Sequence, residues 1–230
     1  MTIRAVFFDI GETLVDETRL WAAWADWLGI PTLTLFAVLG AVIDRGEHHQ
    51  RALAIVRPGF DSERERAARD AAGIADGFVR ADLYPDAVPC LAALRDEGYR
   101  LGLAGNQPAW AGDLLHKLGL PVDVVATAGA WGVEKPSPAF FARLAGVAGF
   151  PPHEIAYVGD RLDPDVLPAI AAGMTAVFLR RGPWGVLHAG RPEAARAHLR
   201  LDSLLDLPPA LRDYRRSPHD QTASPERRST

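Results

Sequence analysis

The chain has 230 residues, a formal net charge of −4 and an apolar fraction of 48%. These values are typical of a soluble globular protein that is long enough for a sizeable hydrophobic core. The net charge is slightly negative and no basic stripe with interleaved aromatic residues is present, which argues against a nucleic-acid partner.

The sequence also carries expectations about the compartment. One cysteine, Cys90, excludes an intrachain disulfide and is typical of a reducing cytoplasm. The N-terminus enters an apolar run almost at once, without a signal-peptide pattern, and no stretch approaches the ~18 continuous apolar residues of a membrane span. Lysine occurs only at Lys117 and Lys135, which indicates a GC-rich bacterial genome. We therefore expect a cytoplasmic bacterial protein with no membrane partner.

Five apolar segments predict β-strands. Most of them are continuously apolar rather than alternating, as in a parallel sheet that helices cover on both faces. The segments are residues 4–8, 100–104, 122–126, 155–158 and 175–179.

Helical patterns separate the last four strands, at residues 85–97, 108–118, 138–148 and 164–172. Ser137 and Asp163 are the expected N-caps of the third and fourth helices, because each precedes a proline at the first helical position. Alternating strands and helices with right-handed crossovers predict an α/β fold, a doubly wound, mainly parallel Rossmann-like sheet.

Roughly ninety residues separate the first strand from the second, far more than a normal crossover requires. Residues 16–82 carry apolar residues at helical spacing, including Trp21, Trp24 and Trp27, and predict an inserted α-helical cap. The tryptophans are expected in the core of this insert, and the adjacent His48 and His49 on a solvated face. Residues 1–15 and 83–213 would form the α/β core.

The C-terminal part carries a weaker signal. Residues 180–185 predict a loop, residues 198–201 a short edge strand, and the segment around Leu204 a one-turn helix. Residues 214–230 are rich in charged, polar and proline residues and predict a disordered tail.

Two carboxylates end apolar strands that lie far apart in the sequence. Asp9 follows the first predicted strand and enters a glycine turn, and Asp160 follows the fourth. A carboxylate at the end of a buried strand must be compensated, and two of them at the same edge of a parallel sheet can share one divalent cation. Each carboxylate could instead cap a turn, but the pair in this context favours a functional site.

Four motifs meet at the carboxyl ends of the predicted strands, where open α/β sheets bind their ligands. They occupy residues 9–14, 104–107, 134–138 and 159–165. With these motifs in this order, the chain resembles the haloacid dehalogenase-like (HAD) superfamily of hydrolases over residues 3–181, and the helical insert stands in the position of that family's cap.

The resemblance implies a role for each matching position. Asp9 matches the nucleophile that becomes an aspartyl-phosphate, and Lys135 matches the basic residue that neutralises this carboxylate and the phosphoryl oxygens. Asp160 and the backbone carbonyl of Gly11 match ligands of Mg²⁺, with Asp9 as a further ligand. Asp165 matches the second acid of its motif, which supports the metal or Lys135.

Two positions depart from the family pattern. Gly11 replaces an Asp that serves as general acid and base, and a lost acid costs on the order of 10²–10⁴ in rate. Glu12 is a possible substitute. Gly105 replaces a Ser or Thr that binds the phosphoryl group, so anion binding is expected from Gly105, Asn106 and Lys135, or from backbone N–H groups near residue 108.

Three functions stay open at this point. The first is a Mg²⁺-dependent phosphatase that acts on a small phosphorylated metabolite. The second is metal-independent hydrolysis of a carbon–halogen bond by aspartate attack, which Gly11 permits and Asp160 disfavours. The third is a weakly active or non-catalytic protein that binds a phosphorylated ligand, which the two glycine replacements favour.

Overall fold

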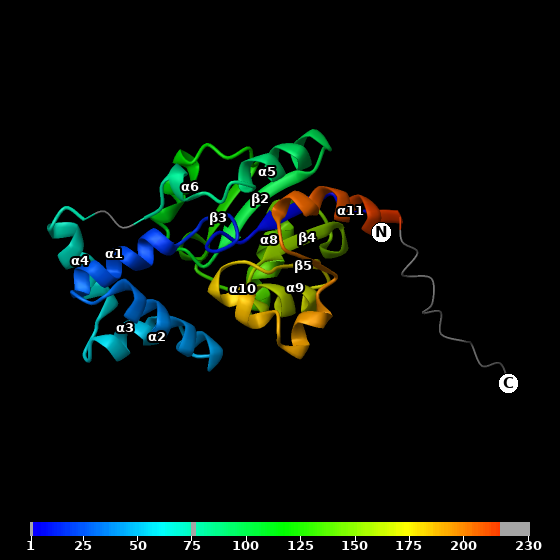
Figure 1. Cartoon of the computed structure of the whole chain (residues 1–230). Coiled ribbons are helices and arrows are strands. Elements are labelled where there is room, and N and C mark those ends of the chain that lie inside the picture. The colour runs from blue at the N-terminus through cyan, green and yellow to red at the C-terminus, as the bar shows by residue number, and fades with distance from the viewer. Residues whose placement is uncertain (1, 75–76, 217–230) are drawn as a thin grey trace.

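A computed structural model describes residues 2–74 and 77–216 of the chain (Figure 1). In this part, six strands form one parallel sheet in the order β3-β2-β1-β4-β5-β6. The predicted doubly wound α/β fold is therefore confirmed. The strands are β1 (Ala5–Phe8), β2 (Arg100–Gly105), β3 (Val124–Thr127), β4 (Ile155–Gly159), β5 (Thr175–Leu179) and β6 (Leu199–Leu201).

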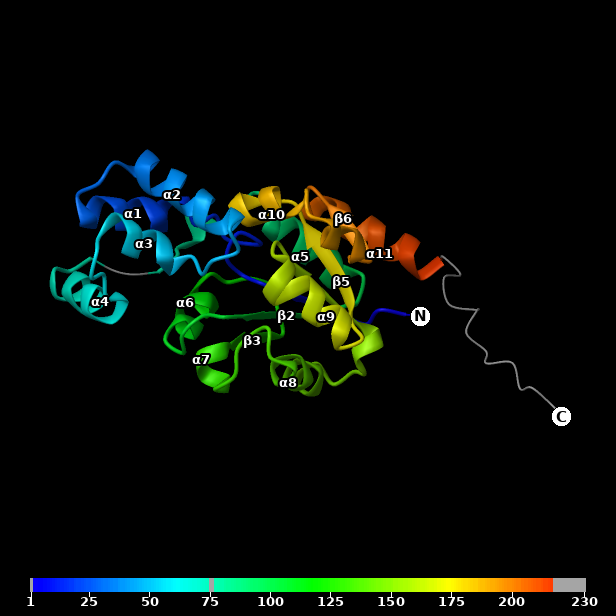
Figure 2. The ribbon, with the colours of Figure 1, turned by 90° about the horizontal axis from the view of Figure 1, so that it is seen from below.

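Alternating side chains of β1 show how the sheet is buried on both faces. Val6 and Phe8 point into one core, which α5 (Ala87–Asp96), α6 (Ala111–Lys117) and α11 (Leu207–Arg216) cover. Ala5 and Phe7 point into the other, which α8 (Pro138–Ala148) and α9 (Leu167–Ala171) cover. Figure 2 shows the two helical layers on opposite sides of the strands. Burial on both faces explains why these strands are continuously apolar.

The insert after β1 forms a separate group of four helices beyond the carboxyl ends of the strands, so the predicted helical insert is present (Figure 1). These are α1 (Thr18–Leu28), α2 (Thr32–Asp44), α3 (Gln50–Val56) and α4 (Ser62–Ala71). The first three share a core that includes Ala25, Leu35 and Leu53, and α4 joins them through polar contacts such as the hydrogen bond from Trp27 Nε1 to Glu65 at 2.9 Å. The two ends of the insert meet, because the backbone N–H of Asp16 donates to the carbonyl of Asp82 at 2.8 Å.

Part of the C-terminal region differs from the sequence prediction. Residues 180–185, expected as a loop, enter helix α10 (Gly182–His188), which begins with Pro183 in its first turn and sends Trp184 into the core of the insert. A short helix α7 (Ala128–Trp131) after β3 was also not predicted. The expected edge strand is β6, and the expected turn near Leu204 is a 3₁₀ helix, Leu204–Asp206.

The predicted tail overlaps helix α11, which extends to Arg216 and buries Leu207 and Leu211 against the sheet. Beyond residue 213 the ring of Tyr214 lies edge-on to that of His198, with 6.2 Å between the centroids, so this part of the helix also packs on the folded chain. Residues 217–230 lie outside the described residues.

The segment predicted as a helix over residues 164–172 consists of two parts. Residues Leu162–Val166 form a π-helical turn, and α9 follows it. Asp163 therefore does not cap a helix, and its exposed carboxylate pairs with Arg161 at 3.0 Å. This turn is wider than an α-helical turn. Its Asp165 side chain folds inward and accepts the backbone N–H of Arg161 at 3.1 Å, which closes the wider turn.

Among the described residues, no single helix is both long and apolar enough to cross a membrane. The bent pair α1 and α2 reaches the required length and apolar composition only when the two helices are taken together.

Gly102 in β2 lies against the side chain of Phe7 in the neighbouring strand β1, with no space for a larger residue. A Cβ at this position would lie 2.2 Å from Cε1 of the buried Phe7 ring. Gly102→Ala should lower the free energy of unfolding by about 1–3 kcal/mol, because the ring has no free space to move into. Gly146→Ala, on the exposed side of α8 with no atom within 4 Å, should raise it by about 0.5–1 kcal/mol. Urea denaturation measures both, and equal effects would contradict the packing argument.

His188 predicts a pH dependence of stability. Its ring is buried and its Nδ1 accepts the N–H of Leu162 at 3.1 Å, while burial and then the charge of Arg191 lower its pKa from 6.5 to about 4. The unfolded chain therefore binds the proton more readily between pH 6.5 and 4, so this contribution to stability is lost as the pH falls through that range, by at most about 3 kcal/mol.

Asparagine at position 188 keeps an acceptor oxygen but does not titrate. His188→Asn should therefore flatten the loss of stability between pH 6.5 and 4, whatever its effect at pH 7. Chemical denaturation of both proteins at several pH values measures the difference, and parallel curves would rule out His188 as the cause.

Candidate active site

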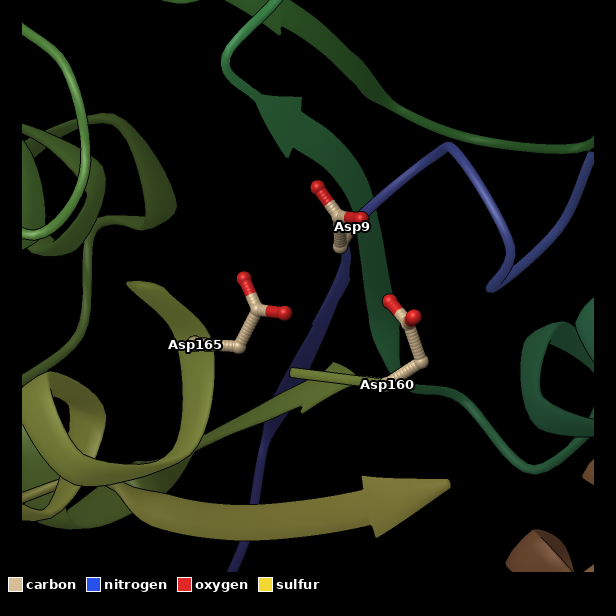
Figure 3. A group of neighbouring side chains, drawn as sticks. All are labelled: Asp9, Asp160 and Asp165. Carbon is tan, nitrogen blue, oxygen red and sulfur yellow. The ribbon is translucent and has the colours of Figure 1, made fainter. Parts of the chain in front are cut away.

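The strand order reverses at β1, and the candidate site lies at the carboxyl end of the sheet at this point. Asp9 follows β1, and its N–H donates to the carbonyl of Val158 in β4 at 2.9 Å. Asp160 follows β4, and Asp165 comes from the π-helical turn. Carboxylate oxygens of the three residues lie within 4.8 Å of one another. Figure 3 shows the three side chains directed toward a common space.

Lys135 joins two of these carboxylates. Its Nζ lies 2.6 Å from Oδ1 of Asp9 and 2.5 Å from Oδ1 of Asp165, and all three side chains are buried. Burial opposes the charged ammonium, but the charges of Asp165 and Asp9 outweigh it and raise the pKa of Lys135 above its ordinary value. Lys135 is therefore a permanent cation beside Asp9 at neutral pH.

Asp160 retains unused binding capacity. Its Oδ1 accepts a long hydrogen bond from the Thr13 hydroxyl at 3.4 Å, whereas Oδ2 is buried and receives no hydrogen bond from any described residue. Burial, followed by the charges of Asp165 and Asp9, raises the pKa of this carboxyl. An uncompensated buried oxygen close to two further carboxylates fits a hard divalent cation, which takes oxygen ligands.

The structure shows what occupies the space beside Gly11. A Cβ built at this position would lie 2.3 Å from Oε1 of Glu17, so the Glu17 carboxyl fills the volume that a side chain at position 11 would take. Burial raises the pKa of Glu17 from 4.5 to about 7, and the charges of Glu12 and Asp9 add to this effect. A carboxyl group therefore lies beside Asp9 despite the glycine.

A similar replacement occurs at Gly105. A Cβ there would lie 2.3 Å from Oε1 of Gln107 and 2.9 Å from Oδ1 of Asp9. The Gln107 side chain thus occupies the position expected for a hydroxyl, and its Oε1 is buried without a hydrogen bond from the described residues. Since amide oxygen and nitrogen can exchange places by rotation, Gln107 can turn two N–H donors to the site.

Asn106 fixes the loop that carries Lys135. Its Nδ2 donates to the carbonyl of Lys135, and its Oδ1 accepts the N–H of Lys135, both at 2.8 Å. The side chain thus clamps the loop that carries Lys135, while its amide keeps a second N–H donor and the residue lines the space around Asp9 and Lys135.

Glu12 is also committed elsewhere. It adopts a positive φ of 53°, its Oε2 accepts the Tyr84 hydroxyl at 2.6 Å, and its Oε1 accepts the N–H of Glu17 at 3.0 Å. Gly182 packs against the same carboxyl. Glu12 therefore ties the turn after β1 to α10 and to the start of the insert, which leaves it poorly placed to replace the missing acid at position 11.

A cavity of about 190 Å³ opens directly on Asp9, Lys135 and Asp160, and a larger hollow of about 1160 Å³ between the core and the insert adjoins it. His49 lines both and lies edge-on between the rings of Trp21 and Trp184, at 5.9 and 6.0 Å. The expectation of a solvated His49 was wrong, because the turn before α3 directs this ring toward the site. His48 is exposed, as expected.

The structure brings Asp9, Lys135, Asp160 and Asp165 together as the motifs suggested. The sequence did not identify Glu17, Gln107 and Arg161, which line the same cavity. Gln107 and Arg161 lie within the motif ranges 104–107 and 159–165 but were given no role, so membership of a motif was the available signal. Glu17 stands eight residues beyond Asp9, and no pattern marks it.

Comparison with known proteins agrees with this geometry. A family model described as haloacid dehalogenase-like hydrolase matches residues 3–173. Glyceraldehyde 3-phosphate phosphatase of Methanopyrus kandleri is 34% identical over 203 residues, which cover 79% of this chain and 86% of that protein. Phosphoglycolate phosphatase 1 of Pseudomonas aeruginosa is 32% identical over 244 aligned positions, covering 95% of this chain and 86% of that protein.

Among solved structures, a HAD phosphatase from Thermococcus onnurineus superposes with a TM-score of 0.57 at 26% identity, covering 91% of this chain and 98% of that one. The family model spans both strands that carry Asp9 and Asp160 and most of the chain. The chain therefore belongs to the haloacid dehalogenase-like hydrolases.

Proposed function

We propose that this protein is a Mg²⁺-dependent phosphatase that acts on a small phosphorylated metabolite through an aspartyl-phosphate on Asp9. The observation that carries the proposal is the pairing of Asp9 with Lys135 at 2.6 Å beside the unpartnered Oδ2 of Asp160. This arrangement provides the Asp9 carboxylate to attack phosphorus. It also provides two positive charges for a phosphoryl group, one on Lys135 and one on a cation bound at Asp160. The two relatives named as phosphatases support the same reaction class.

Asp9 and Asp160, with the backbone carbonyl of Gly11, would hold the cation. When bound, Mg²⁺ supplies positive charge that neutralises the phosphoryl oxygens and lowers their repulsion of the nucleophile. Asp165 keeps Lys135 in position, since the two side chains are 2.5 Å apart.

The remaining residues orient the substrate. Lys135 and the Gln107 amide would contact phosphoryl oxygens, since both line the cavity beside Asp9, and the absence of a side chain at Gly105 gives the Gln107 side chain its place there. Asn106 acts indirectly, because it fixes the backbone of Lys135 at both its N–H and its carbonyl. Asp9 then attacks phosphorus, the ester oxygen leaves, and water hydrolyses the acyl-phosphate.

We assign residues 16–82 to a cap that closes over the site and excludes bulk water during the reaction. The larger hollow, lined by Trp21, Trp24 and Phe60 from the insert and by core residues, would receive the organic part of the substrate.

Hydrolysis of a carbon–halogen bond is the second candidate, since it also uses aspartate attack and does not need an acid at position 11. The buried Oδ2 of Asp160, which accepts no hydrogen bond from the described residues, disfavours it, because a metal-free site would leave this oxygen uncompensated.

Asp9→Asn should abolish turnover of an activated aryl phosphate in the presence of Mg²⁺. The amide is a far weaker nucleophile, and loss of a covalent nucleophile lowers kcat by on the order of 10⁴–10⁶. Asp26→Asn makes the same chemical change on the exposed face of α1 and should retain wild-type rates. Steady-state assays of the purified proteins compare them, and residual activity in Asp9→Asn close to that of wild type would refute the role of Asp9.

Chelation separates the two reaction classes. EDTA should suppress phosphate-ester hydrolysis and added Mg²⁺ should restore it, because the clustered carboxylates of Asp9, Asp160 and Asp165 otherwise repel a phosphate dianion. Release of phosphate and of halide from a 2-haloacid should be measured side by side. Halide release that EDTA does not affect, without phosphate release, would favour the dehalogenase instead.

A further inference from the structure

The proposed reaction needs a proton transfer that no residue assigned so far performs. When Asp9 attacks phosphorus, the ester oxygen must take up a proton as it leaves, and the water that later hydrolyses the acyl-phosphate must lose one. Four carboxyl groups line the 190 Å³ cavity: Asp9, Glu12, Glu17 and Asp160. Asp9 is the proposed nucleophile and Asp160 the proposed metal ligand.

Glu12 is held by two hydrogen bonds, one to each of its carboxyl oxygens. A group with both oxygens engaged in the framework cannot pass a proton to the substrate without breaking these contacts. Glu17 is therefore the carboxyl lining the cavity that the scaffold leaves available.

The position of Glu17 supports this choice. Its Oε1 lies against Gly11, where an added Cβ would be only 2.3 Å away, and Glu17 lines the same 190 Å³ cavity as Asp9. Its Oε2 accepts a long hydrogen bond from Trp21 Nε1 at 3.4 Å, and no ion pair involves Glu17 within residues 2–74 and 77–216. Glu17 also occupies the N-cap position of α1, yet its side chain makes no capping hydrogen bond and turns to the cavity instead.

We propose that Glu17 is the general acid and base of this enzyme, supplied from the junction with the cap in place of a side chain at position 11. This inference rests on the proposed phosphatase function. Glu17 is the last residue before helix α1, so it belongs to the segment that connects the α/β core to the insert.

The proposed reaction has two chemical steps, and Glu17 transfers a proton in each. In the first, the Asp9–phosphorus bond forms, the bond from phosphorus to the ester oxygen breaks, and the Glu17 carboxyl gives its proton to that oxygen. In the second, the Glu17 carboxylate takes a proton from water, the water oxygen bonds to phosphorus, and the Asp9–phosphorus bond breaks. Inorganic phosphate leaves, and Glu17 is again protonated.

Glu17→Gln tests the assignment with two substrates in Mg²⁺. A nitrophenyl phosphate has a leaving group that departs without a proton, so the first step should stay fast while hydrolysis of the acyl-phosphate slows by about 10²–10⁴. Phosphorylated enzyme should then accumulate, which intact-mass measurement after acid quench detects. An alkyl phosphate needs the proton in the first step, so its turnover should fall without accumulation.

Glu193→Gln is the matched control, because Glu193 is exposed and lies in the 3₁₀ helix Pro192–Arg196, outside both cavities. It should behave as wild type with both substrates. A folded Glu17→Gln protein with wild-type rates and no accumulation would overturn the inference. The inference would also be overturned if Glu17→Gln reached wild-type rates at a higher Mg²⁺ concentration in a metal titration, because Glu17 would then support the metal site instead of transferring protons.

A second pair of variants covers the case in which Glu17→Gln fails to fold. Glu17→Ala frees the volume beside position 11, and Gly11→Asp combined with Glu17→Ala returns a carboxylate to it. The double variant should regain hydrolysis of the acyl-phosphate relative to Glu17→Ala. A folded double variant without any gain would contradict the inference. If the wild-type protein releases no phosphate from either ester, the proposed phosphatase function is wrong, and the role of Glu17 is wrong with it. If the wild-type protein is active and the Glu17 variants have wild-type rates, only the role of Glu17 is wrong.

Discussion

The contact on which the site depends is the buried Lys135 ammonium between the carboxylates of Asp9 and Asp165. Removing one partner from such a group leaves an uncompensated charge in the interior, which costs about 3–5 kcal/mol. The surroundings maintain this contact at several points. Asn106 holds the backbone of Lys135, and the π-helical turn after β4 brings Asp165 inward. The Asp9 carboxylate is thereby held in one orientation.

The charges around Asp9 are unbalanced without a cation. Asp9, Asp160 and Asp165 gather within 4.8 Å of one another, and Lys135 alone contacts two of them. Asp160 is left with a buried oxygen that nothing in the described chain satisfies. A stable fold tolerates such an arrangement because the cluster lies at the open end of the sheet, where a ligand can complete it.

The two glycines that depart from the family pattern share one structural explanation. At position 11 the side chain of Glu17 enters the vacated volume, and at position 105 that of Gln107 does so. At position 11 the carboxyl group is preserved while the backbone position that supplies it changes, whereas at position 105 an amide stands where the family pattern has a hydroxyl. The connection between core and insert therefore contributes to the site, and α10 strengthens it, since Trp184 packs into the core of the insert.

The sequence by itself determined the parallel sheet, the place of the insert and the four motif residues, because continuous apolar strands and strand-end carboxylates are local patterns that burial imposes. It predicted a loop over residues 180–185, where helix α10 begins, since Gly182 and Pro183 are equally compatible with a loop and with a helix start. Only the tertiary structure decided which side chains fill the space beside Gly11 and Gly105 and which way Glu12 and His49 point. These outcomes depend on distances between segments that approach one another only when the chain folds. Residue type and spacing along the sequence do not determine these distances.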